Sequence, residues 1–268
     1  MKSVSLELDS EDLAQLYERV SADRQYKAGQ RLIGDLQVGE GETVLDLGCG
    51  TGLLAGYIAN IVGPRGAVTG IDPLPLRIEI AQRRTRSNLR FQVGNAYDLS
   101  EFAPDTFDVI GMNAVFHWLP EKLVPLRQAN RVLKRGGRLG ISTGAKGSPN
   151  PLHSIKERVL SREPYNQYPA AAETVVHRVS VEELAGLLTQ AGFEVKTLET
   201  RSVAPQELSA EAAIRFSEAS SFGNFLGHLP AELRAAARED LKRELERPGA
   251  IATLARARSR IVAIAVKP

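Results

Sequence analysis

Three glycines on alternate positions follow an apolar run in the segment VLDLGCGTG, residues 44–52. A tight turn from a strand into a helix needs positive backbone dihedrals, and a ligand lying across that turn needs space that a side chain would fill. Gly48, Gly50 and Gly52 meet both requirements, so the segment predicts a ligand-binding turn. The alternative is a tight turn that holds no ligand.

Two acids indicate the chemistry of this ligand. A dinucleotide turn has the pattern G-x-G-x-x-G and seats a pyrophosphate on a helix amino terminus. Here Asp46 precedes alternate glycines, and its carboxylate would repel a phosphate but attract an ammonium group. Asp72 ends the next predicted strand, where a carboxylate can accept both hydroxyls of a ribose. Together they predict a nucleoside with a cationic amino-acid tail, whereas Asp72 alone could instead cap a helix before Pro73.

A histidine follows a third strand end. The segment NAVFHWLP, residues 113–120, leaves a predicted strand at Asn113 and places His117 outside its carboxyl end, where doubly wound sheets bind ligands. An unperturbed histidine pKa of about 6.5 suits proton removal near neutral pH. We therefore predict that His117 is a general base or orients the substrate; the alternative is a residue that fills the wall of the site.

These residues must be positioned by alternating strands and helices. The apolar periodicity predicts strands at 43–48, 66–72, 89–96, 107–115 and 137–144, with helices at 52–63, 75–86 and 121–137. The helix over 121–137 is expected to end in a basic last turn and a glycine stop. Strands separated by such helices predict right-handed crossovers and a parallel, doubly wound sheet.

The pattern changes after residue 143. Residues 144–178 are predicted to be a loop with a short helix outside the sheet, and residues 205–250 a second, helical excursion. Between them, Ser180 and Glu183 predict a capping box that opens a helix over 180–193, followed by a strand at 194–200. A final strand is predicted at 259–268, and the two excursions are expected to form a lid.

Composition excludes several function classes. With 34 basic and 32 acidic residues, the net charge of +2 gives no summed field for nucleic acid or an anionic membrane. The one cysteine, Cys49, and four scattered histidines predict neither disulfides nor a metal site. An acidic amino terminus and the lack of a long apolar run predict a soluble, cytoplasmic protein. The basic runs at 83–86 and 256–260 are interpreted as solvated surface.

Five segments in this order and spacing resemble the class I S-adenosylmethionine-dependent methyltransferases: VLDLGCGTG, VTGIDP, VGNAYDL, FDVIGMNAVFHWLP and RVLKRGGRLGIST. The segment HWLPE is similar to small-molecule enzymes such as the trans-aconitate, malonyl-carrier-protein and ubiquinone-pathway methyltransferases, and the lone Cys49 is unlike arsenite-methylating relatives, which use several thiols. The resemblance implies methyl transfer from S-adenosylmethionine to a small molecule. The alternatives are a protein that uses the cofactor without catalysis, as in a cyclase, and an RNA or protein methyltransferase.

The resemblance also implies a Rossmann-like α/β fold. Its seven-stranded, doubly wound sheet has an antiparallel last strand and helical lid insertions. A single methyltransferase domain over 1–268 would contain an N-terminal helical lid (1–40), a cofactor-binding core (40–143) and acceptor-binding cap segments at 144–178 and 205–250.

The resemblance assigns parts of the cofactor to the motif residues. The glycine turn, with Asp46, would hold the methionine part, Asp72 the ribose, and Asn95-Ala96 the adenine, where many relatives have Asp-Ala. Pro73 is also predicted to bind the cofactor. Asn95 could alternatively cap the turn that follows it. Asn113 completes the set of these core residues.

An amino-terminal helix over 16–33 is expected to close over the cofactor in this family. We predict that Tyr17 and Arg24 contact the cofactor carboxylate, because a guanidinium can bind a carboxylate through two hydrogen bonds. The alternative is that Arg24 and Arg31 lie on a solvated face and that Tyr17 packs on the sheet.

Overall fold

The computed structural model describes residues 7–148, 151–169, 176–202, 209–250 and 259–268. The chain divides into two compact units. We call the first the sheet unit; it comprises Ala22–Lys146, His177–Arg201 and Arg260–Pro268. We call the second the helical unit; it comprises Met1–Ser21, Gly147–Val176 and Ser202–Ser259.

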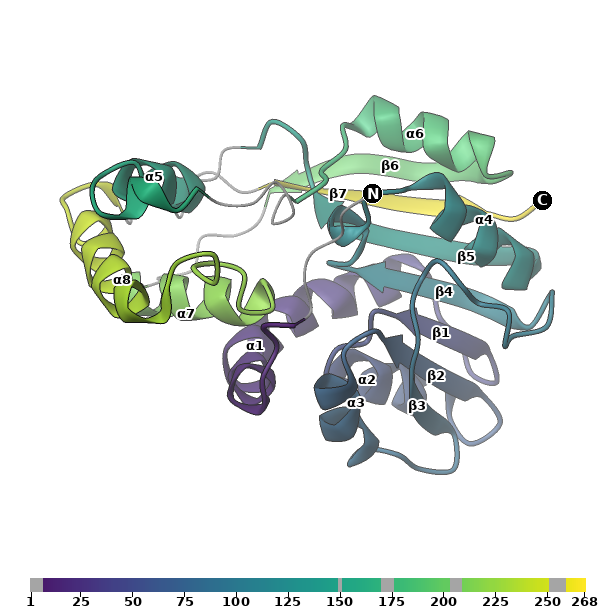
Figure 1. Ribbon diagram of the computed structural model, residues 1–268. Coiled ribbons are helices and arrows are strands. Elements are labelled where there is room, and N and C mark those ends of the chain that lie inside the picture. Colours follow the sequence, from purple (N-terminus) through teal and green to yellow (C-terminus); the bar gives the residue numbers. More distant parts are fainter. Residues whose placement is uncertain (1–6, 149–150, 170–175, 203–208, 251–258) are drawn as a thin grey trace. The chain divides into compact units, whose positions relative to one another are not determined.

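The sheet unit is built on seven strands in the order β3-β2-β1-β4-β5-β7-β6 (Figure 1). The pairs β1–β2, β1–β4, β2–β3 and β4–β5 are parallel, and β7 runs antiparallel to β5, which confirms the predicted sheet and its antiparallel last strand. The strands are β1 (Thr43–Leu47), β2 (Ala67–Asp72), β3 (Leu89–Val93), β4 (Phe107–Asn113), β5 (Leu133–Gly144), β6 (Glu194–Ser202) and β7 (Ser259–Val266).

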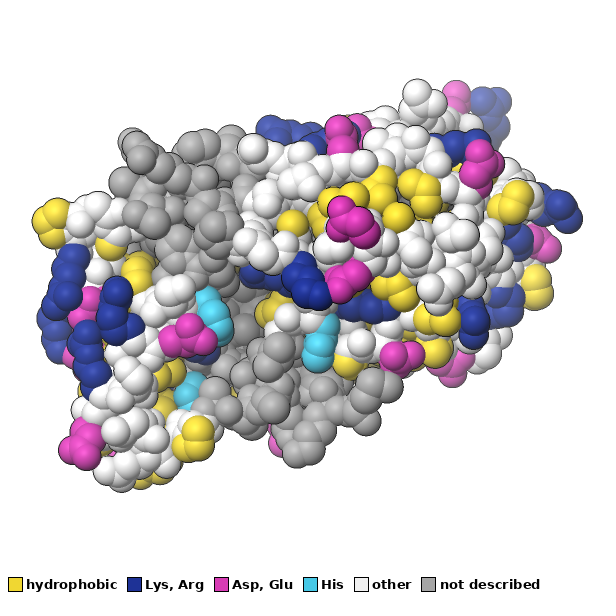
Figure 2. Space-filling model, turned by 90° about the horizontal axis from the view of Figure 1, so that it is seen from above, with side chains coloured by type: hydrophobic (Ala, Val, Ile, Leu, Met, Phe, Trp, Pro, Cys, Tyr) yellow, Lys and Arg dark blue, Asp and Glu magenta, His cyan; other side chains and the backbone are white. Residues whose placement is uncertain are grey.

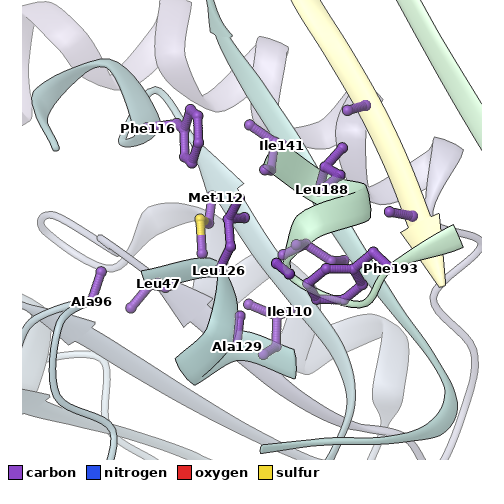
Figure 3. Packing of buried hydrophobic residues seen from close by; sticks show 14 of the residues in the cluster. Leu47, Ala96, Ile110, Met112, Phe116, Leu126, Ala129, Ile141, Leu188 and Phe193 are labelled. Atoms are coloured by element: carbon purple, nitrogen blue, oxygen red, sulfur yellow. The ribbon is translucent and has the colours of Figure 1, made fainter. Parts of the chain in front are cut away.

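Two separate apolar clusters show that helices cover both faces of this sheet. One cluster joins strand residues to α1 (Glu11–Asp35), α2 (Leu53–Val62) and α3 (Pro75–Gln82), and the other joins them to α4 (Leu123–Val132) and α6 (Val181–Gln190). Neighbouring strand residues alternate between the clusters, with Val44 in the first and Leu45 in the second. Figure 3 shows the second cluster, where Leu126 of α4 lies beside Met112 of β4.

The capping box predicted at the start of α6 is present. The Ser180 hydroxyl accepts a hydrogen bond from the Glu183 N–H at 3.1 Å, and the Glu183 carboxylate accepts one from the Ser180 N–H at 2.8 Å. Two backbone donors at the helix end are thereby satisfied, which stabilises the helix at this residue. The sequence alone predicted this capping box because its two residues are only three positions apart.

The prediction for the end of α4 is wrong. The helix ends at Val132, and Leu133 pairs with Phe107 as the first residue of β5 instead of continuing a helix to residue 137. Lys134 donates to the Asp108 carboxylate of β4 at 2.8 Å, so the basic residue serves strand pairing and not a helix carboxyl end. Helix α3 likewise ends at Gln82, four residues before its predicted end.

The helical unit contains α5 (Pro151–Leu160), α7 (Ala210–Ser220), α8 (Ala231–Leu245) and a 3₁₀ turn, η2 (Tyr165–Gln167). Ile155, Ile214 and Leu241, one from each helix, belong to its own apolar cluster. Glu244 of α8 is only 3% exposed and accepts from Arg162 at 2.7 Å, which pairs its buried charge. These elements confirm the predicted helices of the two excursions; their role as an acceptor-binding cap stays a prediction.

Charged side chains of both signs are interspersed on the face shown in Figure 2. Within the described ranges, no helix is long and apolar enough to cross a membrane. The same ranges contain no group of three or more His, Cys, Asp or Glu side chains that could hold a metal ion.

Candidate active site

The turn between β1 and α2 has the backbone conformation that its glycines predict. Gly48, Gly50 and Gly52 have φ angles of +81°, +54° and +83°, in the left-handed region that side chains disfavour. A Cβ at Gly48 would lie 2.2 Å from a Val115 methyl group, and one at Gly52 would lie 2.7 Å from the Phe91 ring. At these two positions, packing within the chain is by itself a reason for glycine, so the missing side chains are not evidence for a ligand.

Asp72 holds this turn against the end of β2. Its Oδ2 accepts a hydrogen bond from the Gly50 N–H at 2.9 Å, and its Oδ1 accepts one from the Leu74 N–H at 3.1 Å. The second contact closes a turn before α3 and is not a helix cap, because α3 begins at Pro75 and its N-cap residue, Leu74, has no side-chain cap. Each carboxylate oxygen can accept more than one hydrogen bond, so the acceptors that ribose hydroxyls require are still present.

Arg77 of α3 is a buried cation beside Asp72 that sequence reasoning missed, being only 4% exposed. Burial raises the pKa of the Asp72 carboxyl, whereas the Arg77 charge and the two backbone donors lower it. In the sequence Arg77 stands among the charged residues of a helix and carries no local sign that it is buried.

Asp46 at the end of β1 contributes a buried acceptor without a partner. The residue is 2% exposed, and its Oδ2 has no hydrogen-bond partner among the described residues. Burial, followed by the nearby Asp72 charge, raises the pKa of Asp46 to about 7, although a backbone hydrogen bond from Ala55 opposes the shift. A buried carboxylate in this state is suited to an incoming ammonium group, which would supply both the missing donor and the opposite charge.

Asn113 contributes a second such acceptor from the adjacent strand. Its side-chain N–H donates to the Gln25 carbonyl of α1 at 2.8 Å, whereas its buried Oδ1 has no partner within the part of the chain that is described. Gly29 permits this approach of α1, because a Cβ there would lie 3.0 Å from the Asn113 amide nitrogen. Asp46 and Asn113 thus present unpartnered oxygens at the carboxyl ends of neighbouring parallel strands, the edge where such sheets bind ligands.

The residues predicted at the adenine follow β3. Asn95 is exposed, and its Oδ1 accepts from the Tyr97 N–H at 2.9 Å, which is the turn-capping alternative. Ala96 is buried, at 5% exposed. Val93, which pairs with Asp72 across the strands, is 53% exposed, so an apolar surface lies uncovered near this position.

The amino-terminal contacts stay predictions. The Arg24 side chain lies outside the described residues, and Tyr17 belongs to the helical unit. The neighbouring Gln25 does reach the strand edge, through its carbonyl contact with Asn113.

His117 lies in a 3₁₀ turn, η1 (Phe116–Trp118), that follows β4. Its Nδ1 lies 3.2 Å from the Thr143 hydroxyl oxygen of β5, within hydrogen-bond distance. Burial and the charges of Arg260, Arg178 and Lys122, in that order, lower the pKa of His117 to about 3. The expectation of an unperturbed pKa is therefore wrong, and the imidazole is neutral at neutral pH.

Lys122 supports this turn and was missed by sequence reasoning. It is 9% exposed, and its ammonium donates to the Phe116 carbonyl at 2.5 Å and to the His177 carbonyl at 2.7 Å. Burial lowers the pKa of Lys122 to about 8. The two hydrogen bonds join η1 to a segment more than fifty positions later in the chain, and no local pattern indicates such a link.

A methyltransferase domain model matches residues 39–192, more than half of the chain. The chain belongs to the class I S-adenosylmethionine-dependent methyltransferases. It is 31% identical over 204 residues to an arsenite methyltransferase of Halobacterium salinarum, covering 75% of this chain and 48% of that protein. It is 36% identical over 110 residues to a demethylmenaquinone methyltransferase of Staphylococcus aureus, covering 40% and 45%, so the chain spans about half the length of these relatives.

A solved structure shares the methyltransferase fold. The N-methyltransferase 2 of Haemonchus contortus, in complex with phosphomonomethylethanolamine and S-adenosylhomocysteine, superimposes with a TM-score of 0.66 at 18% identity. The match covers 98% of this chain and 59% of that one.

The basic run at 83–86 has a structural role beside the methyltransferase turn. Arg84 donates to the Thr51 carbonyl at 3.1 Å, and Arg86 donates to the Gly56 carbonyl at 3.0 Å. Arg86 is exposed, as the surface interpretation predicts, whereas Arg84 is only partly exposed; their hydrogen bonds join the segment after α3 to α2 and to the turn before it. Of the second run, residues 256 and 258 lie outside the described residues.

Proposed function

We propose that this chain transfers a methyl group from S-adenosylmethionine to a small-molecule acceptor. The two buried, unpartnered oxygens of Asp46 and Asn113 carry the proposal, because an ammonium group has the donors that both lack. S-adenosylmethionine supplies a methyl group already activated on a sulfonium, so the protein's contribution is binding, orientation and exclusion of water.

The remaining cofactor contacts follow from the same edge of the sheet. In this proposal, the turn of Gly48, Gly50 and Gly52 holds the methionine part and Asp72 accepts from the ribose. The exposed Val93 side chain and the Asn95-Ala96 pair would contact the adenine base. Tyr17 and Arg24 are kept as candidates for the cofactor carboxylate.

We assign His117 the orientation of the acceptor. A general base works best with a pKa near the working pH, and the pKa of about 3 makes His117 a weak proton acceptor. A neutral imidazole whose Nδ1 is engaged by Thr143 can still present its second nitrogen to an acceptor. This role requires geometry and no protonation change.

The acceptors of the relatives favour a small molecule, and the buried Cys49 disfavours arsenite. The two relatives described above are methyltransferases of arsenite and demethylmenaquinone, neither of which is a polymer. Cys49 is 8% exposed, and burial raises the pKa of its thiol, so it does not present the reactive thiolate that arsenite would bind. The proposal therefore favours an organic acceptor.

The test is methyl transfer from cofactor with a labelled methyl group to panels of phenols, amines and carboxylic acids, with S-adenosylhomocysteine as the second readout. We expect acceptor-dependent formation of both products, and loss of both in Asp46→Asn. Cofactor that binds but is not consumed with any small molecule, RNA or protein would support the cyclase-like alternative. Turnover with RNA or protein alone would support the macromolecular alternative.

A further inference from the structure

β6 (Glu194–Ser202) is an edge strand of the seven-stranded sheet. It is the last strand in the sheet order, with β7 as its one neighbour among the described strands (Figure 1). Val195 and Leu198 pack against the apolar cluster that includes α4 and α6, which holds β6 in the sheet. Most of its other side chains are exposed. The outer row of backbone N–H and C=O groups of β6 therefore has no partner strand in the described part of the chain.

The length and composition of β6 permit pairing with a further strand. It is nine residues long and contains neither proline nor glycine, whereas many edge strands are kept from pairing by being short or by carrying proline. Charged side chains are another common barrier, because like charges directly opposite each other repel. The order of the charges along β6 therefore decides which strand can pair with it.

The charges of β6 have the same order at both ends of the strand. Near its start the acid Glu194 precedes the base Lys196 by two positions, and near its end Glu199 precedes Arg201 by two positions. Within the chain, Lys196 binds Glu194, and the Arg201 Nε donates to the Glu199 carboxylate at 2.7 Å. A strand with this order meets opposite charges when it pairs with a reversed copy of itself.

A two-fold axis between residues 197 and 198 gives this match. Two copies of β6 related by such an axis run antiparallel. Lys196 then lies opposite Glu199 of the second copy, and Glu194 lies opposite Arg201 of the second copy. The symmetry repeats both pairs, and opposite charges directly across an antiparallel pair stabilise it.

Other registers lose the match. A shift by one residue in either direction places Lys196 opposite a neutral side chain. A shift by two residues places either Glu194 opposite Glu199 or Lys196 opposite Arg201, which are like charges and destabilise the pair. The charges thus select a single register, and they specify a second copy of this chain as the partner.

A further contact leaves the end of β6 with an excess of acid. Arg201 binds Asp35, the last residue of α1, at 2.5 Å in addition to Glu199. One base is therefore shared by two acids in the same chain. In the matched register, Lys196 of the second copy would lie opposite Glu199 and offset this excess.

We propose that β6 pairs antiparallel with β6 of a second copy of this chain in the matched register, so that two seven-stranded sheets join into one. The interface is closed by its two-fold axis and forms a dimer rather than a fibre. It consists of one pair of strands, which is smaller than the interfaces of stable dimers. We therefore expect a weak dimer, with a dissociation constant between about 1 µM and 1 mM.

The first test is analytical ultracentrifugation of the unmodified protein up to about 1 mM. We expect a monomer–dimer equilibrium that weakens at high salt, because exposed ion pairs are screened. A monomer at every concentration would overturn the proposal, and it would leave the edge to a strand of another protein.

A charge exchange tests the register. Lys196→Glu and Glu199→Lys each place like charges opposite one another twice in a dimer, so each variant alone should dimerise about tenfold or more weakly. An equal mixture of the two variants restores opposite charges at both positions, and dimers of one variant with the other should form again. Dimerisation that survives in both separate variants, or that does not recover in the mixture, would overturn the register.

The control pair is Glu40 and Arg65, which form an exposed ion pair at 3.1 Å elsewhere in the sheet unit. Arg65→Glu and Glu40→Lys change the net charge by the same amounts as the two test variants, and we expect both to dimerise like the unmodified protein. Weakening equal to that of the test variants would assign the effect to net charge and overturn the proposal.

Hydrogen exchange in the unmodified protein locates the interface without any variant. As the protein concentration rises through the dissociation constant, the amides of β6 should become more protected, because its outer N–H groups gain acceptors. The amides of β3 (Leu89–Val93), at the opposite edge of the sheet, should not change. A dimer that leaves β6 exchange unchanged would overturn the proposal.

Discussion

Asp72 accepts a hydrogen bond from the Gly50 N–H at 2.9 Å, so the acid that ends β2 also fastens the glycine turn that follows β1. The same carboxylate is the proposed partner of the ribose. Cofactor contact and turn geometry are therefore coupled in one side chain, and a substitution at Asp72 acts on both.

We predict that Asp72→Ala weakens S-adenosylhomocysteine binding by about 1.5 to 3 kcal/mol, as expected when hydrogen bonds to a charged group are lost. It should also lower thermal stability, because the Gly50 N–H loses its acceptor in a buried position. Asp72→Asn is the control, since its amide oxygen can still accept from Gly50. Unchanged calorimetric affinity in folded Asp72→Ala would refute the ribose assignment.

The pKa of about 7 at Asp46 predicts pH-dependent cofactor binding. An ammonium group favours the ionised carboxylate, so binding releases a proton wherever Asp46 is protonated in the free protein. Affinity should rise with pH up to about 7 and level off above it, falling by up to about tenfold per unit below that value. Calorimetry in buffers of different ionisation enthalpy measures the released proton. A flat profile between pH 5 and 8, or one that persists in Asp46→Asn, would count against the ammonium contact.

The raised pKa of Asp46 also predicts that ionising its buried carboxyl destabilises the ligand-free protein at high pH. The folded-state pKa of Asp46 is raised above its ordinary value of 3.8, so its contribution to stability is fully present below that pH and is lost as pH rises through about 7. Asp46→Asn should therefore raise the melting temperature at pH 8 more than at pH 4. A larger gain at pH 4 would show that burial does not disfavour the ionised form.

Gly48 offers a test of packing against backbone strain. Gly48→Ala combines a φ of +81° with a contact 2.2 Å from Val115, whereas Gly136→Ala has a φ of +76° and no atom within 4 Å of the new Cβ. We expect about 1 to 2 kcal/mol of destabilisation at Gly136, and about 1 to 3 kcal/mol more at Gly48.

Val115→Ala separates the cost of side-chain packing at Gly48 from the cost of backbone strain. In that background the extra cost of Gly48→Ala over Gly136→Ala should largely disappear, measured by denaturant unfolding in a double-mutant cycle. Equal costs for Gly48→Ala with and without Val115 would assign the whole effect to the backbone.

Features of the fold that depend on residues close together in the sequence were predicted correctly. The alternation of strands and helices, the capping box of Ser180 and Glu183 and the positive φ angles of the turn each depend on residues a few positions apart. The end of α4 was missed because Leu133 is a strand residue only through its pairing with Phe107.

The candidate site was predicted less completely, because its electrostatics come from distant parts of the chain. The choice of Asp46 and Asp72 needed only their positions at strand ends. The low pKa of His117 depends on Arg178 and Arg260, which are about 60 and 140 positions away and were not assigned to the site. The periodicity of apolar residues does not predict which distant charged residues lie near a given side chain.

The neutral imidazole of His117 should not titrate in the working pH range of the enzyme. Because its pKa is lowered to about 3, the profile of kcat/KM against pH should show no inflection from this residue between pH 5 and 8. As an orienting group, His117→Ala should reduce kcat/KM by about ten- to a hundredfold, the cost of one or two hydrogen bonds, while S-adenosylhomocysteine affinity is unchanged. His117→Gln should recover part of the loss, because an amide can donate and accept without titrating. A loss of about 10³-fold or more in kcat, with an inflection near pH 6.5 that disappears in His117→Gln, would instead establish a general base.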